Sequence, residues 1–456
     1  MTSIDCRRIL VAQMLLIMAL SVLLSTNCSA ETPDNGMNSL TLEQCLSVAR
    51  AHNPKVLASW EKINELVADY TAARSTFFPR IAASSYYYKI DSGRLGNGGA
   101  ATSRLFHEES LHSLTGKQIL FDGFKTYFNQ KAAGIGIEAQ KQEAENTTRA
   151  IEYAVTEAFY RLIEADENVK VAENALEQRR EFEQLTRAFY EAGKVTKLDF
   201  FRASSQASEA EQAVTEAKNA RQIAGMILAK TMGSDIDSSS AAALKISGGF
   251  MDDSFPVLDF EALWKRTQEE NPEIKKLDLA IEQSKELIQA ARANYFPEIS
   301  LQGSTGKRHR DQGGSKGEWM GGVFMEFPIF EGGLTRAQVA KVSSQSMQLM
   351  ELRRNRIDEL RVELKDAIRS LENARQGLVT AQQMIQADTE SYESSLALYK
   401  YGKATGLDVL QAQVDLTRSK FALISYRVAE NIAQARIKQI AGQASMDTKT
   451  LPGAPK

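Results

Sequence analysis

The sequence predicts a mainly α-helical protein in which long, internally duplicated α-hairpins are joined to a membrane β-barrel. Three observations carry this prediction. One set of sequence features occurs twice in the same order, apolar residues recur every seventh position over long stretches, and four runs of about ten residues alternate between apolar and polar side chains. Each half of the chain therefore combines long helices with a pair of strands.

Composition limits the classes of function that fit. The 456 residues are 43% hydrophobic and 25% charged, which is typical of a folding chain, and the formal net charge is −3. No block of basic residues forms a stripe, so no nucleic-acid partner is expected. Only 9 prolines occur, and Ala, Glu, Gln, Arg and Leu are abundant. This bias favours long helices.

The N-terminus has the form of a secretory signal peptide, which we assign to residues 1–30. Arg7-Arg8 precedes an apolar run from Ile9 to Leu24, and Cys28-Ser29-Ala30 places small residues before the cleavage point. The run is shorter than a membrane-spanning helix, and polar sequence follows it. Cys45 is then the only cysteine of the exported chain, so no internal disulfide is expected.

Short helices open each half of the chain. Thr41-Leu-Glu-Gln44 has the form of a capping box, and the helix that it begins ends at Asn53-Pro54. A second helix, from about Lys55 to Thr76, ends at Phe78-Pro79. The same pairs recur in the second half, as Asn271-Pro272 and Phe296-Pro297. We interpret the chain as an internal duplication.

The duplication defines the domain organisation. We assign a first repeat to residues 31–233, with a β-hairpin at 80–120 and a long helical hairpin at 122–232. An inter-repeat linker covers 234–256, the second repeat covers 257–442 with a β-hairpin at 298–329 and a helical hairpin at 331–441, and a disordered tail covers 443–456.

The periodicity changes from helical to alternating after each Phe-Pro pair. Strand-like runs at Arg80–Ile90 and Glu298–Lys307 are followed by glycine-rich polar loops at Asp91–Ser103 and Arg308–Gly317 and by returning strands at Ser110–Leu120 and Glu318–Ile329. Hairpins of this length are typical of outer-membrane barrels, although soluble hairpins share the pattern. The smallest transmembrane barrels have about eight strands, so these four need other subunits to close.

The longest pattern is a heptad repeat in the segments after the strands. Eight residues are spaced by seven: Met350, Ile357, Leu364, Leu371, Leu378, Ile385, Tyr392 and Tyr399. The second apolar position of each heptad carries Leu360, Ala367, Ala374 and Ala381. Strict heptads predict supercoiled packing, and small residues let helix backbones approach closely. A helix from Asp122 to Tyr190 would span roughly 100 Å, which indicates rods rather than a globular core.

Each rod is interrupted by the same turn, which we call the tip. Tyr190-Glu-Ala-Gly193-Lys-Val-Thr-Lys-Leu-Asp199 recurs as Tyr399-Lys-Tyr-Gly402-Lys-Ala-Thr-Gly-Leu-Asp408. Glycine supplies the backbone conformation that ends a helix, and a short polar loop folds the two helices into an antiparallel hairpin. One end of the molecule is therefore expected to present two copies of this turn.

The sequence contains little that is typical of an active site. His52, His107, His112 and His309 are not spaced as metal ligands, and Gly134-Ile-Gly136-Ile-Glu-Ala139 matches a dinucleotide-binding string only formally, because it lies inside a heptad helix. We therefore predict no catalytic, cofactor-binding or metal site.

Asp199 and Asp408 each lie just beyond a tip glycine, at the start of a helix. One interpretation is helix capping, because a carboxylate accepts from free backbone N–H groups and meets the positive end of the helix dipole. The other is that, in an oligomer, one carboxylate per copy forms a ring at the mouth of a pore and selects for cations. The sequence leaves both interpretations open.

Taken together, these features make the chain resemble the TolC-like outer-membrane efflux proteins over nearly the whole mature sequence. The shared features are the duplication, the Asn-Pro and Phe-Pro pairs, Leu120-Phe-Asp-Gly123, Ile329-Phe-Glu-Gly332 and the two tips. The resemblance implies a homotrimer in the outer membrane of a Gram-negative bacterium, with four strands per chain in a shared 12-stranded barrel and a trimeric 12-helix tunnel across the periplasm. It also implies contact with outer-membrane lipid and two protein partners, a periplasmic adaptor (membrane fusion) protein and an inner-membrane pump of the RND, ABC or MFS type.

The resemblance also implies roles for particular residues. By position, the tip residues that contact the adaptor are Gly193, Lys194, Val195, Gly402, Lys403 and Ala404. Asp199, Asp408, Tyr399 and Gln411 match positions that hold the periplasmic entrance closed or line its constriction. The best-known family pattern has a basic residue in place of Ala404 and an aspartate in place of Gln411. The closing network of this chain is therefore expected to differ, and its acidic ring to carry fewer charges.

The function that the resemblance implies is passive conduction in an efflux or type I secretion system. The pump supplies energy, the adaptor opens the tips, and this protein supplies a polar-lined duct. The alternative from another class is an exported coiled-coil scaffold with soluble hairpins. An enzyme ranks third, because no site was found.

Overall fold

The computed structural model describes residues 40–89, 108–234, 246–247, 250, 259–310 and 314–442. All of these belong to one compact unit that begins at Leu40. The predicted signal peptide, the first glycine-rich loop, most of the inter-repeat linker and the predicted tail lie outside the described residues.

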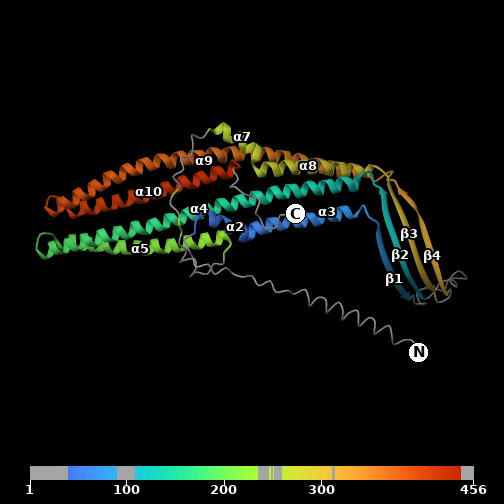
Figure 1. Ribbon diagram of the computed structural model, residues 1–456, viewed down its shortest axis with the longest axis horizontal. Helices are drawn as coiled ribbons and strands as arrows, with labels where there is room; N and C mark the ends of the chain where they lie inside the picture. Colours follow the sequence, from blue (N-terminus) through green and yellow to red (C-terminus); the bar gives the residue numbers. More distant parts are fainter. Residues whose placement is uncertain are drawn as a thin grey trace, which may run out of the picture. The chain divides into compact units, whose positions relative to one another are not determined.

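Two series of elements follow one another in the same order (Figure 1). The first is α2 (Leu42–His52), α3 (Pro54–Ser75), β1 (Arg80–Lys89), β2 (Glu108–Phe121), α4 (Lys125–Glu191) and α5 (Lys197–Met232). The second is α7 (Phe260–Glu270), α8 (Pro272–Arg292), the short 3-10 turn η3 (Ala293–Tyr295), β3 (Glu298–Arg310), β4 (Gly314–Glu326), α9 (Leu334–Lys400) and α10 (Gly406–Ile440).

The Asn-Pro pairs join helices in both repeats. Asn53 caps α3 through bonds from the backbone N–H groups of Lys55 and Val56 to its Oδ1, and its Nδ2 donates to the carbonyl of Thr231 near the end of α5 at 2.7 Å. Asn271 caps α8 in the same way and donates to the carbonyl of Ile440 at 3.1 Å. Each asparagine thus satisfies groups at the ends of two helices, which explains its burial.

The long helices pair as antiparallel hairpins. α4 and α9 contain 67 residues each and would each span roughly 100 Å. α4 packs against α5 and α9 against α10, while α3 runs along α4, α8 runs along both α4 and α9, and α10 contacts α4 (Figure 1). None of the helices in the described ranges combines the length and the apolar character that a bilayer crossing requires.

The core follows the heptads along the rods. Leu360, Leu364 and Leu371 are buried where α9 packs against α10, and Ala374 and Ala381 continue this contact. In the first repeat the matching apolar positions are buried as well: Val155, Ala158, Leu162, Ala165 and Ala172. Met350, the first residue of the heptad series, is 45% exposed in the single chain. The prediction of heptad-packed rods is confirmed.

The four strands form one antiparallel sheet in the order β1-β2-β3-β4. The register pairs Tyr88 with Glu109, Glu109 with Arg310, and Arg308 with Lys316. The expected loop from Arg308 to Gly317 is wrong, because β3 continues to Arg310 and β4 begins at Gly314. Charged side chains at the end of β3 hid its alternation from sequence inspection, and they are stable there because they bind partners across the sheet.

Candidate functional site

The two tips have the same backbone geometry at the ends of the hairpins. Gly193 and Gly402 lie in the left-handed region, with φ of 70° and 72°. In each turn the next residue closes the helix end: Lys194 donates its backbone N–H to the carbonyl of Phe189 at 2.8 Å, and Lys403 donates to that of Leu398 at 2.9 Å. These bonds satisfy carbonyls that the ending helix leaves free.

A capping box starts the returning helix in both tips. Thr196 Oγ1 donates to Asp199 Oδ2 at 2.6 Å, and the backbone N–H of Asp199 donates to Thr196 Oγ1 at 3.2 Å. Thr405 Oγ1 donates to Asp408 Oδ2 at 2.7 Å, and the N–H of Asp408 donates to Thr405 Oγ1 at 3.3 Å. The Thr405 side chain and backbone hold the pKa of Asp408 below its usual value. Both aspartates therefore cap helices, whereas a ring of carboxylates at a pore mouth stays a prediction.

Tyr399 lies inside the protein, between the two hairpins. Its ring is 4% exposed and packs against Phe182 and Phe189 of α4, with ring centroids 5.1 and 5.7 Å away. Its hydroxyl lies 3.4 Å from Thr186 Oγ1, and burial raises its pKa above the usual value. The residue that matched an entrance position thus joins the first repeat to the second.

The other predicted tip residues divide into two groups. Val195 and Ala404 pack against the Tyr399 cluster, so their side chains support the turn from within. Lys194 and Lys403 are exposed, and Lys194 Nζ lies 5.4 Å from the centre of the Phe189 ring. Gln411 is exposed one turn into α10, and its Nε2 donates to Asp415 Oδ2 at 3.1 Å. Asp415 thus places a carboxylate one turn beyond Gln411.

Sequence reasoning missed several residues of this region. The capping threonines Thr196 and Thr405 were detectable, because Thr-x-x-Asp before a helix is a capping-box pattern. Phe182, Phe189 and Thr186 had no local signal, because their contact with Tyr399 joins positions from different repeats.

The sheet at the other end has two unlike faces. One face carries exposed apolar side chains, which we call the apolar face: Ile81, Leu114, Leu301, Trp319, Val323 and Met325. The opposite, polar face carries Tyr86, Glu109, Ser304, Arg308, Arg310 and Glu318. Trp319 and Met325 are six residues apart on β4, which corresponds to about 20 Å of strand. This height approaches the apolar band of about 25 Å on outer-membrane barrels.

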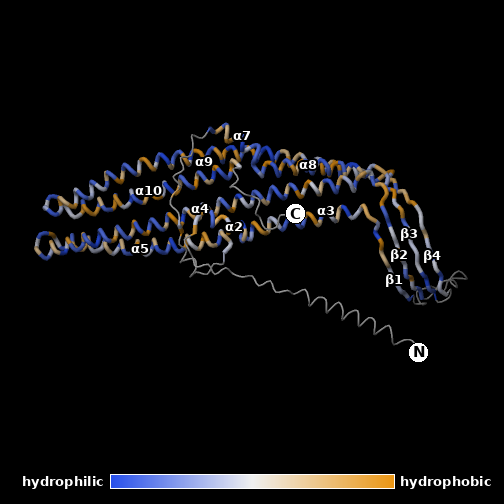
Figure 2. Tube along the Cα trace, viewed as in Figure 1, coloured by the Kyte–Doolittle hydropathy of each residue, from blue (hydrophilic) through white to orange (hydrophobic). Residues whose placement is uncertain are grey.

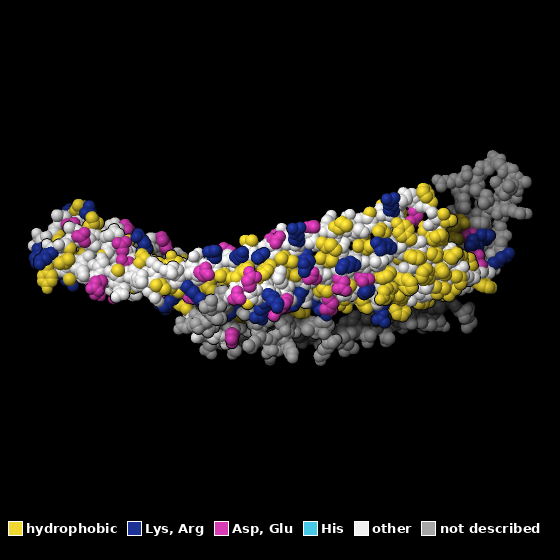
Figure 3. All heavy atoms as spheres, turned by 90° about the horizontal axis from the view of Figure 1, so that it is seen from above, with side chains coloured by type: hydrophobic (Ala, Val, Ile, Leu, Met, Phe, Trp, Pro, Cys, Tyr) yellow, Lys and Arg dark blue, Asp and Glu magenta, His cyan; other side chains and the backbone are white. Residues whose placement is uncertain are grey.

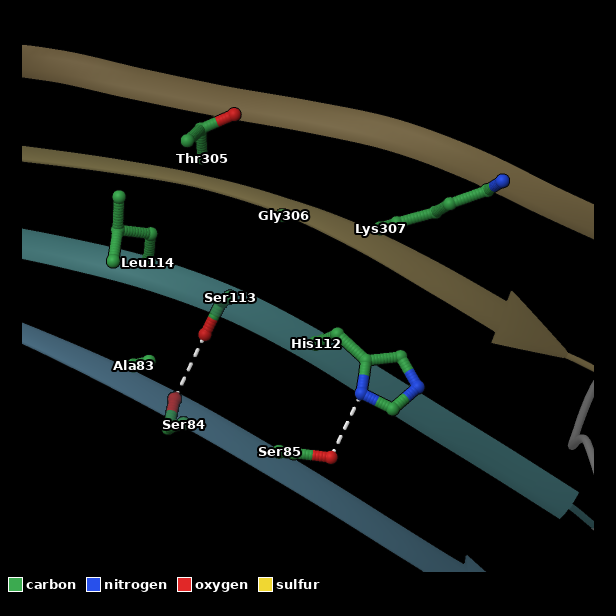
Figure 4. A pocket seen from close by; sticks show the side chains of 9 residues that line it. All are labelled: Ala83, Ser84, Ser85, His112, Ser113, Leu114, Thr305, Gly306 and Lys307. Carbon is green, nitrogen blue, oxygen red and sulfur yellow. Dashed lines mark hydrogen bonds between the residues drawn. The ribbon is translucent and has the colours of Figure 1, made fainter. Parts of the chain in front are cut away.

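Polar residues replace apolar ones toward the strand ends that lie far from the helices. Figure 2 shows this change in hydropathy along the strands, and Figure 3 shows hydrophobic side chains gathered over the strands and the adjoining helix ends. At the transition a shallow open hollow of about 650 Å³ crosses the sheet (Figure 4). Ser85 bonds to His112 Nδ1 there at 2.7 Å, and Lys307 lies opposite His112 in the register.

The described residues offer no metal centre. No group of three or more His, Cys, Asp or Glu side chains within the described ranges could hold a metal ion. The thiol of Cys45 is buried among apolar residues, which raises its pKa to about 11. The features suited to function are therefore the two tips and the two-faced sheet.

Comparisons with known proteins agree with this geometry. A family model described as outer membrane efflux protein matches residues 45–234 and 263–443. Outer membrane efflux protein BepC of Brucella suis is 23% identical over 421 residues, which cover 89% of this chain and 86% of the relative. Outer membrane protein TolC of Escherichia coli is 26% identical over 458 residues, covering 90% and 84%. The crystal structure of the Campylobacter jejuni CmeC outer membrane channel has the same fold, with a TM-score of 0.77 at 17% identity over 91% of this chain and 90% of that one.

Proposed function

Because this chain belongs to the outer membrane efflux protein family, we propose that it is the outer-membrane exit duct of a tripartite efflux or type I secretion system. The protein resides in the outer membrane, and its long helices extend through the periplasm. It acts as a passive channel: substrates enter at the tips from an adaptor and an inner-membrane pump, and they leave through the barrel.

The observation that carries this proposal is the two-faced sheet. Exposed side chains such as Trp319, Val323 and Met325, at 83%, 65% and 70%, cover the apolar face, and charged groups occupy the other face. β1 and β4 each pair with a single strand among the described residues, so both edges present free backbone groups. Three copies that pair β4 of one with β1 of the next would close a barrel with the polar face inside.

The tips suit the docking of the adaptor. Apart from their own chain neighbours, no atom of the described residues lies within 4 Å of the point where a Cβ of Gly193 or Gly402 would lie, so each turn leaves room for a partner. Lys194 and Lys403 stand beside these glycines, with side chains in solvent. In this proposal Val195 and Ala404 hold the turn in shape, and the glycines and lysines form the adaptor contact.

Closure of the entrance rests on the contact between the two hairpins. Tyr399 joins α9 to α4 through the rings of Phe182 and Phe189, and a tip that swings outward must break this packing. In this proposal Asp199 and Asp408 lie at the mouth, while Gln411 and Asp415 continue the polar surface along α10. The adaptor opens the duct by replacing these contacts.

One experiment separates the duct from a coiled-coil scaffold. Full-length protein is purified from outer membranes in detergent, tested for heat-resistant trimers on gels, and then added to planar bilayers. The duct predicts trimers and unitary conductance steps. Protein that leaves the outer-membrane fraction without detergent and produces no conductance would contradict the channel function.

A further inference from the structure

A group of charged residues lies on the polar face at the strand ends far from the helices. Glu109 is 2% exposed and is the centre of the group. Its Oε1 accepts from Tyr86 Oη at 2.7 Å and from Arg308 Nη1 at 3.1 Å, and its Oε2 accepts from Arg310 Nε at 2.7 Å. Arg308 also donates to Glu318 Oε1 at 2.9 Å. One buried carboxylate of β2 therefore orients two arginines of β3, and the bonds of the group reach Tyr86 on β1 and Glu318 on β4.

Positive charge is in excess in this group. Among the described residues at this end of the polar face, Arg308, Arg310 and Lys316 stand against two carboxylates, Glu109 and Glu318, which leaves one net positive charge per chain. Lys316 lies opposite Arg308 in the register and forms no ion pair with a described residue, and the buried Arg308 Nε has no hydrogen-bond partner in the described part of the chain. The hydrogen bonds to Glu109 thus hold the arginines in place, while Arg308 Nε and the Lys316 ammonium group remain without a partner among the described residues.

Neither the charges on the described remainder of the polar face nor the net charge of the connecting loops, counted from the sequence, offsets this excess. At the opposite end of the polar face, Arg80 and Lys117 balance Glu298 and Glu326. By sequence, the loops that connect the strands are also balanced, with Arg94 and Arg104 against Asp91 and Asp311. The excess positive charge therefore lies on the polar face at the strand ends far from the helices.

We propose that Arg308, Arg310 and Lys316 form an anion-attracting belt inside the outer end of the barrel, which determines specificity for solutes with carboxylate, sulfate or phosphate groups. The inference rests on the proposed function, because three copies in a closed barrel bring the three excess charges around one lumen. Water-filled clefts lined by one sign of charge concentrate ions of the other sign. The duct then has opposite polarity at its ends, with carboxylates at the tips and cations at the exit.

The chain offers a matched pair of lysines for the test. Lys316→Gln removes an exposed charge on the polar face without leaving Glu109 unpaired, and Lys307→Gln removes a lysine of the neighbouring strand on the apolar face. Lys307 lines the hollow of Figure 4 and lies outside the proposed lumen. Both variants change the charge of the protein equally and lie on adjacent strands near the same end of the sheet, but on opposite faces.

The measurement is the reversal potential of single channels in a KCl gradient. At about 10 mM salt, Lys316→Gln is expected to raise the cation-to-anion permeability ratio by about two- to fivefold, with a smaller change at about 1 M because salt screens the field. Lys316→Glu should give a larger rise, and Lys307→Gln should leave the ratio unchanged. Trimers that resist heat serve to show that every variant is assembled.

Two results would overturn the belt. Conducting channels in which Lys316→Gln and Lys316→Glu leave the ratio unchanged, or in which Lys307→Gln shifts it equally, refute the belt while the duct stands. A wild-type protein that forms no channel refutes the proposed function and the belt with it.

Discussion

At the scale of single residues, the tip carboxylates combine two roles that the sequence presented as alternatives. The capping bonds of Asp408 all use Oδ2, from the backbone N–H and the hydroxyl of Thr405 at 2.8 and 2.7 Å. Oδ1 takes no part in these bonds, and the residue is exposed. A capping carboxylate can therefore still present its charge to passing ions.

We predict that Asp408→Asn weakens the cation preference of the channel, because it removes one negative charge per chain at the proposed entrance. The control is Thr405→Ala, which breaks the capping box but keeps the charge. Reversal potentials at low salt are the measurement. Equal selectivity in wild type and Asp408→Asn would assign this residue to capping alone.

The cation preference that Asp408 gives the channel is expected to depend on pH. The bonds from Thr405 lower the pKa of Asp408 below its usual value, so the folded state holds the charged form more strongly than the unfolded state does. Its contribution to capping and to cation preference is complete above the unfolded pKa and is lost as the pH falls through the lower folded pKa. Selectivity should therefore persist to more acid pH than a free aspartate allows.

We predict that the ring of Tyr399 stabilises the contact between the two hairpins. Tyr399→Ala removes a buried ring from the contact between the hairpins, and large-to-small changes of this kind cost about 3–5 kcal/mol. Tyr399→Phe keeps the ring and loses only the 3.4 Å contact with Thr186, which should cost about 1 kcal/mol or less. Protease cleavage near the tips should increase in the alanine variant and stay near wild type in the phenylalanine variant. Equal cleavage in both would contradict a closing role for the ring.

At the scale of elements, each hairpin combines a heptad-packed rod with a turn whose conformation is set locally. The rods derive their cohesion from buried residues such as Leu364 and Leu371, which belong to one apolar cluster with Ala433, Ile437 and Ile440 of α10. The turns depend on one left-handed glycine and one capping box each. Rod and turn can therefore be altered independently.

Gly402 and Gly233 both have a left-handed backbone conformation, but we expect them to differ in how much stability an alanine substitution costs. Gly402→Ala places a Cβ in open space and should cost only the backbone strain of about 1–2 kcal/mol. Gly233→Ala would in addition place its Cβ 2.6 Å from the carbonyl oxygen of His52 and 2.7 Å from the Cα of Asn53. Because those contacts are with backbone, α2 and α3 would have to move. Thermal unfolding followed by circular dichroism should show the larger loss for Gly233→Ala, and the reverse order would contradict this account.

At the scale of the whole molecule, the single chain is incomplete. Its sheet ends in two open edges, and its apolar face leaves Trp319 83% exposed. Water disfavours such a face, while a bilayer accepts it, and only closure by other copies satisfies the edges within the membrane. Membrane insertion and assembly are therefore one requirement.

The two faces of β4 supply a prediction at this scale. Val323→Lys puts a charge on the apolar face, where lysine near the bilayer midplane costs about 2–4 kcal/mol per subunit. Met320→Lys puts the same charge on the polar face of the same strand, where water fills the proposed lumen. We expect the yield of heat-resistant trimers in outer membranes to fall for Val323→Lys and to remain near wild type for Met320→Lys. Equal yields would contradict the assignment of the faces.

Sequence alone determined the order and nature of most elements, because the signals involved are local. Capping boxes, Asn-Pro pairs and heptads act within a few helical turns, so Thr41-Gln44 and the rod from Leu360 to Ala381 could be predicted by spacing. The duplication strengthened each assignment, since the same signals had to agree in two places. The trimeric assembly, in contrast, was predicted from the resemblance to the TolC-like family.

Only the tertiary structure decided which distant residues meet. It placed Tyr399 against Phe182 of the other repeat, and it made Arg308 and Arg310 part of a strand by pairing them with Glu109. Sequence spacing records neighbours along one helix or strand. A buried ring or carboxylate is stabilised by whatever the fold brings against it, and those partners lie far away in the chain.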